Sequence, residues 1–465
     1  MIVGSAGKVP GVSRSVHNWT DAPGCRLDVR WIPLTGPRTE TAASTVKFAA
    51  LHTPSYRKYF AFNLMSMTAD NIEHVISYWV MFQTFHSPAL GGFAVISHWM
   101  PFLLFSLHAG ALADRYDRRK LIQISQVMFM SASLAWGVLF LLGTLQMWHA
   151  VVILLIHGAA GVVGAPASQL IIHDMVPKQD LPSAIRLNAS SRYLAILVGP
   201  AIGGGLMLLL GPAWGLLTNV LIFFPFTIFI ARLHGAGRAS TDAPSSRAFG
   251  FADVWASFLQ ARAEPHVVTM VLLAGASSFF VGNAFQAQMP EYAHFLGADD
   301  TGARYSILLA ANAAGAVIGV VLLETATLVQ PSVRATIIFA GLWALAMGLF
   351  PMTGNYPLAV LLLVVAGIFS IAFTSMAQTL VQMLAPPAIR GTVVGLFNTA
   401  MLGLRAGSGI TVGILGAFIG VRLSLEISSL MVLLVAVVLL ARSAAAASAT
   451  SPAHSAQPPS AQPGT

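Results

Sequence analysis

Long apolar runs, separated by short segments that contain glycine, proline or charged residues, repeat along the chain from residue 58 to residue 442. An α-helix needs about 20 apolar residues to cross the hydrocarbon core of a bilayer, so this region has room for about twelve crossings. The pattern therefore predicts an all-α, polytopic membrane protein. The expected spans are 58–84, 90–113, 121–143, 149–175, 183–210, 213–233, 266–294, 303–328, 333–352, 356–384, 391–418 and 421–442.

The balance of residue types agrees with membrane insertion. Hydrophobic residues make up 56% of the chain, charged residues only 9%, and the mean hydropathy is +0.74. Soluble proteins carry about 25% charged residues, so this chain has too few charges to cover a water-facing surface. The net charge of +8 does not indicate nucleic-acid binding, because the basic residues gather beside apolar segments. The single cysteine, Cys25, allows no intramolecular disulfide and no Cys-based metal site.

Two polar segments flank the apolar region, and a third divides it. The first is rich in Gly, Pro, Ser and Thr and the last is of low complexity, so both are expected to be disordered. The first lacks the layout of a signal peptide, so we expect it to be retained, unless translation starts later than Met1. The expected domains are an arm over 1–54, an N-terminal half of six spans over 55–233, a linker over 234–265, a C-terminal half of six spans over 266–442 and a tail over 443–465.

Basic residues mark one side of the membrane. Loops after even-numbered spans hold most of them, whereas loops after odd-numbered spans hold only Arg304 and Arg422. The positive-inside rule then predicts a multi-pass plasma-membrane protein with both termini in the cytoplasm. The residues on the expected cytoplasmic side are Arg115, Arg118, Arg119, Lys120, Lys178, Arg232, Arg238, Arg247, Arg262, Arg334 and Arg390.

The two halves share a short pattern in their fifth spans. Shifting the chain by 210 residues pairs Asn188 with Asn398, Gly199 with Gly409 and Gly203 with Gly413. Together with the six-plus-six layout, this favours a duplicated bundle with a binding site between its halves.

The loop between the second and third spans carries the first recognisable motif. It reads GALADRYDRRKLI over residues 110–122 and resembles the signature loop of the major facilitator superfamily, G-x-L-A-D-R-x-G-R-R-x-x-L. Asp117 stands where that pattern has glycine. We expect a cytoplasmic gate here, in which Gly110 permits close helix approach and Asp114 caps a helix or pairs with arginine; the alternative is a basic loop that only sets topology. The candidate gate residues in this loop are Gly110, Asp114, Arg115, Arg118 and Arg119.

A second motif lies in the fifth span. Residues 199–204 read GPAIGG and resemble the G-P-x-x-G-G core found in antiporters and exporters of this superfamily, although Ala195 replaces an expected glycine. Proline bends a helix by removing a backbone hydrogen bond, and small residues allow tight helix packing. The motif adds Gly199, Pro200, Gly203 and Gly204 to the conformational gate; the alternative is a packing seam without directional meaning.

The resemblance covers about residues 56–440. FLLFSLHAGALADRYDRRKLIQISQ, DLPSAIRLNASSRYLAILVGPAIGG and IRGTVVGLFN look like segments of the bacterial branch that contains the enterobactin exporter and macrolide-efflux relatives. The resemblance implies the major facilitator fold, with twelve helices in two six-helix halves, alternating access and proton-driven export. The counterpart of the signature loop at 324–334 keeps only one basic residue, Arg334, so the gate is expected to be asymmetric.

Ionisable residues inside a span are costly and are functional candidates by default. The first span contains Asp70, Glu73 and His74 within one turn. A rise of about 1.5 Å per residue places both carboxylates roughly 18–22 Å from the expected cytoplasmic boundary. Asp70 and Glu73 share a helix face, and two neighbouring carboxylates resist being ionised together. We therefore expect this pair to exchange protons.

Two arginines are candidate partners of this pair. Arg405, in the eleventh span, lies at a depth of roughly 22 Å, and Arg192, in the fifth, at roughly 14 Å. We expect Arg405 to hold the deprotonated pair or an anionic group of the substrate; the alternative is a static charge pair that stabilises one conformation. Asn283 and Gln286 are candidates to line the cavity, or to form an interhelical hydrogen bond.

Other chemistries have less support. His98, His108 and His157 lack the spacing of metal ligands, so we expect packing or backbone hydrogen bonding and no metal. Asp174 is a candidate for the gate network. The sequence has no G-x-x-x-x-G-K-[ST] loop, which excludes ATP-driven transport through this chain. It has no plausible nucleophile triad, so we expect neither an enzyme nor a cofactor.

The combined expectation is a monomeric secondary transporter of the bacterial inner membrane that exports a siderophore-like metabolite or a hydrophobic drug in exchange for protons. Its partners are then the small molecule, protons and the lipid bilayer, without nucleotide or nucleic acid. Two alternatives stay open. One is a transporter of opposite direction or with a lipid-like substrate, and the other is a non-transporting membrane sensor that binds a partner through its N-terminal arm.

Overall fold

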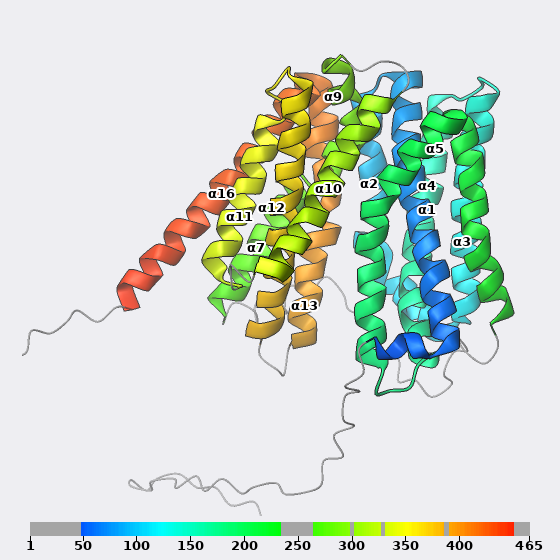
Figure 1. The fold of residues 1–465 in the computed structure, drawn as a ribbon, viewed down its shortest axis with the longest axis horizontal. Coiled ribbons are helices and arrows are strands. Elements are labelled where there is room, and N and C mark those ends of the chain that lie inside the picture. Colours follow the sequence, from blue (N-terminus) through cyan, green and yellow to red (C-terminus); the bar gives the residue numbers. More distant parts are fainter. Residues whose placement is uncertain (1–47, 234–263, 298–301, 327–330, 386–389, 451–465) are drawn as a thin grey trace, which may run out of the picture. The chain divides into compact units, whose positions relative to one another are not determined.

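The computed structural model describes residues 48–233, 264–297, 302–326, 331–385 and 390–450 (Figure 1). These residues belong to one compact unit that begins at Ala43. Within the described ranges the elements are all helices, as the apolar runs predict. Most of the predicted arm and nearly all of the predicted linker lie outside the described residues.

The first half consists of long helices with recognisable starts. Proline occupies the first turn of α1 and α2, where its missing N–H costs no intrahelical bond. Ser87 caps α2 by accepting from the Leu90 N–H, and Asp117 caps α3 by accepting from the Arg119 N–H. The elements are η1 (Ala49–His52), α1 (Pro54–Phe85), α2 (Pro88–Arg115), α3 (Arg118–Leu141), α4 (Met147–Leu170), η2 (Ile171–Asp174) and α5 (Leu181–Arg232).

Helix α5 contains two of the predicted spans. Its continuity is broken at Gly211, whose φ of 79° lies in the left-handed region that favours glycine. Pro212 follows directly and cannot donate the next backbone hydrogen bond. The sequence places a bend at Pro200 in the same helix, whereas the non-helical backbone angles fall at Gly211.

The second half is more segmented. The predicted span 266–294 is divided among three helices, and the span 391–418 alternates between α-helical and π-helical turns. The elements are α7 (Pro265–Phe280), α8 (Ala284–Ala287), α9 (Met289–Phe295), α10 (Ala303–Ala326), α11 (Val333–Leu349), α12 (Tyr356–Leu384), α13 (Arg390–Asn398), η3 (Thr399–Gly403), α14 (Arg405–Ser408), η4 (Gly409–Ile414), α15 (Leu415–Ile419) and α16 (Val421–Thr450).

The last helix continues beyond the predicted membrane boundary. Helix α16 reaches Thr450, whereas the sequence predicts disorder from residue 443. The extra turns read SAAAASAT, and alanine has the highest intrinsic helix propensity. The segment is of low complexity, but its alanine-rich composition favours a helix.

The helices have the length and composition of membrane spans. Nine stretches among the described residues are long and apolar enough to cross a bilayer, and Val333–Leu349 is a shorter apolar helix. One of the nine, Leu194–Arg232, covers parts of both spans in α5, and α1 is too polar to be counted although it has 32 residues. Together these segments match the twelve predicted ranges. The fold is that of an all-α membrane protein.

Contacts between the two halves converge on one end of α1 and α2. The Tyr305 hydroxyl of α10 donates to the Val75 carbonyl at 2.8 Å, and the Gln288 amide donates to the Pro88 carbonyl at 2.6 Å. Gly92 of α2 packs directly against η4, where any Cβ would meet backbone atoms. The halves therefore touch backbone to backbone beside the first turns of α2.

Candidate functional site

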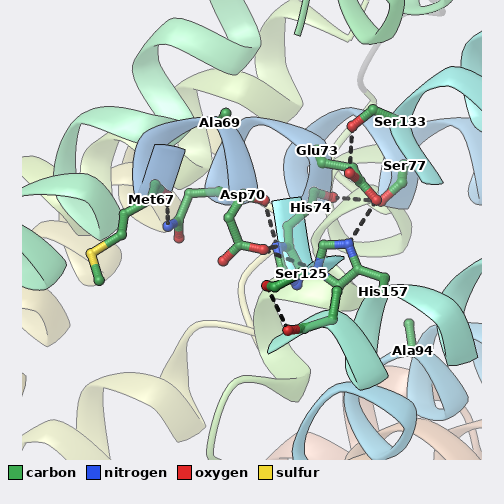
Figure 2. A network of polar contacts seen from close by, with 12 residues as sticks. Met67, Ala69, Asp70, Glu73, His74, Ser77, Ala94, Ser125, Ser133 and His157 are labelled. Carbon is green, nitrogen blue, oxygen red and sulfur yellow. Dashed lines mark hydrogen bonds and ion pairs between the residues drawn. The ribbon is translucent and has the colours of Figure 1, made fainter. Parts of the chain in front are cut away.

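Two carboxylates and three imidazoles from three helices meet inside the first half. Figure 2 shows Asp70, Glu73, His74 and His157. Helix α1 supplies Asp70, Glu73 and His74, α2 supplies His98 and α4 supplies His157. Figure 2 shows the His157 ring between the side chains of Asp70 and Glu73. Its Nδ1 lies 2.8 Å from Glu73 Oε1, and its Nε2 lies 3.0 Å from Asp70 Oδ1. We call these five residues the α1–α2–α4 cluster.

Two side chains hold Glu73, and a third holds one of them. His157 contacts Oε1, and the Ser133 hydroxyl of α3 donates to Oε2. The Asn219 amide of α5 donates to Ser133 Oγ at 3.2 Å and to the Ala69 carbonyl at 2.9 Å. The Glu73 residue is only 2% exposed. Both of its oxygens therefore have donors, which a buried carboxylate requires.

Asp70 is held more loosely. Its side chain is 27% exposed, and Oδ1 lies 3.0 Å from His157 Nε2 but without hydrogen-bond alignment. His74 Nδ1 contacts the Asp70 main-chain carbonyl at 2.7 Å and Oδ1 at 3.8 Å. The two carboxylates thus share one imidazole while differing in exposure and in the quality of their contacts.

A glycine allows the imidazoles of α2 and α4 to meet. Gly158 follows His157 and lies directly against the Ser97 carbonyl, so a Cβ has no room there. This close approach brings the His98 and His157 rings to a centroid distance of 5.4 Å. The His74 ring completes the group, at 4.8 Å from His98 and 4.7 Å from His157.

A small cavity adjoins the cluster. Its walls include Glu73, His74, Ser97, His98 and His157, and the space open to the centre of a water molecule is about 10 Å³. That volume holds about one water molecule. An organic substrate therefore does not fit there in this conformation, whereas a water molecule or a hydronium ion does.

The three imidazoles also have the proximity of metal ligands. Their ligand atoms lie within 4.8 Å of one another. A metal needs a free nitrogen from each ligand, and both nitrogens of His157 already lie within 3.0 Å of carboxylate oxygens. The arrangement is accordingly that of an ion-paired cluster.

Sequence spacing did not reveal the role of the histidines. His98 and His157 were expected to pack or to bond the backbone, but both lie in the cluster. His157 and Glu73 are 84 positions apart, and no spacing rule connects residues on different helices. The available signal was chemical, since a histidine inside an apolar span is as unusual as a carboxylate there.

The predicted arginine partners lie elsewhere around the cluster. The Arg405 guanidinium carbon is 4.9 Å from the centre of the Trp99 ring, and its Nε donates to the Met401 carbonyl at 3.1 Å. Arg192 lies half-buried on α5. Asn283 and Gln286 contact each other at 3.2 Å, where α7 gives way to α8. The contacts described for Asp70 and Glu73 are with imidazoles and with Ser133. Their pairing with Arg405 stays a prediction.

The signature loop forms ion pairs beside the ends of α2 and α4. Arg118 Nη1 lies 2.8 Å from Asp174 Oδ2, and Arg119 Nη2 lies 2.7 Å from Asp117 Oδ2. Arg119 also donates to the Leu233 carbonyl at 2.6 Å, which links α3 to the end of α5. The hydrogen bond from Arg119 holds the pKa of Asp117 below its usual value. Asp117, the departure from the superfamily pattern, is therefore the residue that positions Arg119.

The remaining residues of the predicted gate differ in their surroundings. Asp114 is half-buried and Arg115 is exposed. Among the described residues, no atom lies within 4 Å of a Cβ placed on Gly110, so the close helix approach expected there is not seen in this part of the structure. The loop packs through its arginines instead.

The glycines of the second motif do permit close packing. Gly199 lies directly against Asn71, and a Cβ on Gly203 would lie 3.3 Å from Ile72 and Val75. A Cβ on Gly204 would approach Ser306 of α10 to 2.6 Å. The motif therefore sets α5 against α1 at the level of Asp70 and also against the second half, with Pro200 within the same buried stretch.

The chain matches, over residues 45–462, the major facilitator family model described as transmembrane secretion effector. It therefore belongs to this family. A curated relative, the staphyloferrin A transporter of Staphylococcus aureus, is 21% identical over 177 residues, which cover 38% of this chain and 45% of that protein. The chain thus matches less than half of that relative's length.

Solved transporters share the fold. A bacterial homologue of the human lysosomal transporter Spinster, inward-facing and unoccupied, aligns with a TM-score of 0.63 at 15% identity, covering 86% of this chain and 98% of that one. The nucleoside transporter NupG gives 0.63 at 16% identity, covering 83% and 98%, and a D-xylose–proton symporter gives 0.59 at 17%, covering 84% and 97%. The chain is thus a multi-pass membrane protein of this family, with the fold of solved transporters.

Proposed function

We propose that this transporter exports a small organic molecule, a siderophore-like metabolite or a hydrophobic drug, in exchange for protons. The family description and the likeness to a siderophore transporter support the direction and the cargo. The observation that carries the coupling is the pairing of Asp70 and Glu73 with His157 inside the membrane-spanning region. Buried ionisable groups in such a position mark proton and substrate pathways.

In the proposed cycle, residues 55–233 rock against residues 266–442 around a site near the middle of the membrane. Proton and substrate compete for the region that contains Asp70, Glu73 and Arg405, so binding of one releases the other. The signature loop and the Gly199–Gly204 segment act as the gate. The protein works as a monomer with both termini in the cytoplasm.

Untargeted mass spectrometry of cells and medium tests the proposal. We would compare a deletion strain with strains that carry the wild-type protein or the Asp70→Asn variant, each with and without a protonophore. We expect a compound that the deletion strain retains, that the wild type releases, and whose release stops with the protonophore or with Asp70→Asn. His108→Gln is the matched control, because His108 is exposed and outside the cluster.

The outcomes separate the alternatives. Release that persists at full rate with the protonophore would remove proton coupling. A compound that accumulates inside only when the protein is present would indicate import. Equal compound profiles in all strains would count against transport and favour a membrane sensor. Such a sensor would stop working when the arm, residues 1–54, is deleted.

A further inference from the structure

The two carboxylates of the cluster differ in ways that assign them different tasks. We propose that Asp70 alone binds and releases the exchanged proton, whereas Glu73 stays ionised and, with His157, forms a fixed pair that positions Asp70. This inference rests on the proposed proton-coupled function and refines it, because the spacing of Asp70 and Glu73 alone predicts the same proton-exchanging role for both.

Glu73 has the surroundings of a permanent anion. It accepts from a hydroxyl on α3 and contacts an imidazole on α4, and the hydroxyl is itself held by Asn219 on α5. A carboxylate with a donor on each oxygen is favoured in its charged form. Taking up a proton would cost Glu73 one of these contacts, since a protonated oxygen no longer accepts in the same way.

The contacts of His157 constrain its protonation. A neutral imidazole has one N–H, and an ionised carboxylate only accepts. Because Nδ1 faces Glu73 and Nε2 faces Asp70, both carboxylates can be ionised beside His157 only when the ring is an imidazolium. The three groups then carry a net charge of −1, and one further proton brings the group to neutrality.

That further proton belongs on Asp70. The Asp70 side chain is 27% exposed while the Glu73 residue is 2% exposed, so Asp70 is the more accessible of the two carboxylates. No aligned hydrogen bond reaches Asp70 Oδ1, so protonating Asp70 breaks no such bond there, whereas protonating Glu73 would disturb its contacts with Ser133 and His157. In the binding step a hydronium ion gives its proton to the Asp70 carboxylate, which leaves a carboxylic acid and water. Release is the reverse.

Other titratable groups surround Asp70 and tune this step. His74 and Tyr78 lie on the same helix, His98 faces the group from α2 and His157 from α4. Arg192 on α5 acts electrostatically on His98. His98 Nδ1 is buried without a hydrogen-bond partner among the described residues, and it lines the one-water cavity. The His98 imidazole is placed to pass a proton between a water molecule in that cavity and the other members of the cluster.

Infrared titration tests the assignment without any cargo. The full-length protein is reconstituted in phosphatidylethanolamine–phosphatidylglycerol vesicles, and the carbonyl band of protonated carboxylic acid is followed as the pH is lowered. The chain contains 17 Asp and Glu residues, so several carboxyls contribute to this band. We expect one titrating component of the band that Asp70→Asn removes and Asp70→Glu restores. Glu73→Gln retains the band. His157→Gln moves its midpoint to higher pH by roughly 1–3 units, because it removes a cation that favours ionised Asp70.

The control and the contrary results are direct. His108→Gln is expected to leave both the band and its midpoint unchanged. A band that disappears in Glu73→Gln and persists in Asp70→Asn would overturn the assignment, as would a midpoint that His157→Gln does not move. A protein that shows the expected band but no protonophore-sensitive export would overturn the proposed function and leave the assignment intact. Size-exclusion chromatography of each variant identifies those that misfold. If Asp70→Asn misfolds, the infrared titration of Asp70→Glu is compared with that of the wild type instead.

Discussion

The guanidinium of Arg405 stacks over the ring of Trp99 at 4.9 Å, and this contact joins the second half of the chain to α2 of the first. The Trp99 ring in turn lies 4.8 Å from the ring of His98. Arg405 therefore reaches the cluster through an aromatic ring. A cation over a partly desolvated tryptophan contributes about 1–2 kcal/mol, so the contact favours the arrangement of the halves seen here.

Trp99→Leu removes this aromatic contact and keeps an apolar residue. We expect protonophore-sensitive export to fall by about tenfold, because a loss of 1–2 kcal/mol changes an equilibrium by that factor. The measurement is export of the compound identified by mass spectrometry, normalised to protein level. Trp148→Leu is the matched control, since Trp148 is 60% exposed, and it should export normally. Equal export by both variants would show that the Arg405–Trp99 contact is unimportant.

Ser133→Ala removes the hydroxyl that donates to Glu73. We expect the free energy of unfolding to fall by about 1.5–3 kcal/mol, the usual cost of losing a hydrogen bond to a buried charge. Denaturant unfolding of the detergent-solubilised protein measures it. Ser131→Ala is the control, because Ser131 bonds only the Met128 carbonyl on the exposed side of the same helix. A loss no greater than that of the control would mean that Glu73 does not need this donor.

Gly158→Ala places a methyl group against the Ser97 carbonyl. We expect a destabilisation of about 1–3 kcal/mol, because backbone atoms must move apart. The same movement separates His98 from His157, so the midpoint of the Asp70 titration should also change. Gly205→Ala is the control, since no atom lies within 4 Å of its Cβ position. Thermal unfolding and infrared titration of both variants provide the comparison.

Asp117→Asn tests the ion pair of the signature loop through its pH dependence. The pKa of Asp117 is lowered in the folded protein by Arg119, so its charged form stabilises the fold above the usual carboxyl range. This contribution disappears as the pH falls through the lowered pKa. We expect the free energy of unfolding of the wild type to exceed that of the variant by less than about 1 kcal/mol at neutral pH, because the side chains of the pair are 23% and 21% exposed and water still screens them. This difference in the free energy of unfolding should vanish in acid. A difference that grows on acidification would contradict the pairing of Asp117 with Arg119.

Much of the fold could be predicted because membrane insertion imposes a simple pattern. Apolar runs of fixed length predict where helices lie, and Gly211 with Pro212 predicts the break in α5. The depth of Asp70 and Glu73 followed from counting residues along one helix. Local composition and helical rise are sufficient for these features.

The partners of those carboxylates could not be predicted in the same way. Which residue faces Glu73 depends on the rotation of α4 about its axis and on how closely Gly158 lets α2 approach. The spacing of residues within one segment determines neither the rotation of α4 nor the distance between α2 and α4. Depth and charge in the sequence favour Arg405 as the partner. The structure places the imidazole of His157 between the two carboxylates.

The π-helical turns around Arg405 have a mechanical consequence. Segments η3 and η4 lie immediately before and shortly after this residue. Each π-helical turn accommodates an extra residue, and converting it to an α-turn rotates the following chain by about 100° per residue. If one segment tightens while the other loosens, Arg405 swings around the helix axis while the helix ends stay in place. Because η4 packs directly against Gly92 of α2, such a change in the eleventh span would be coupled to α2, the helix that carries Trp99.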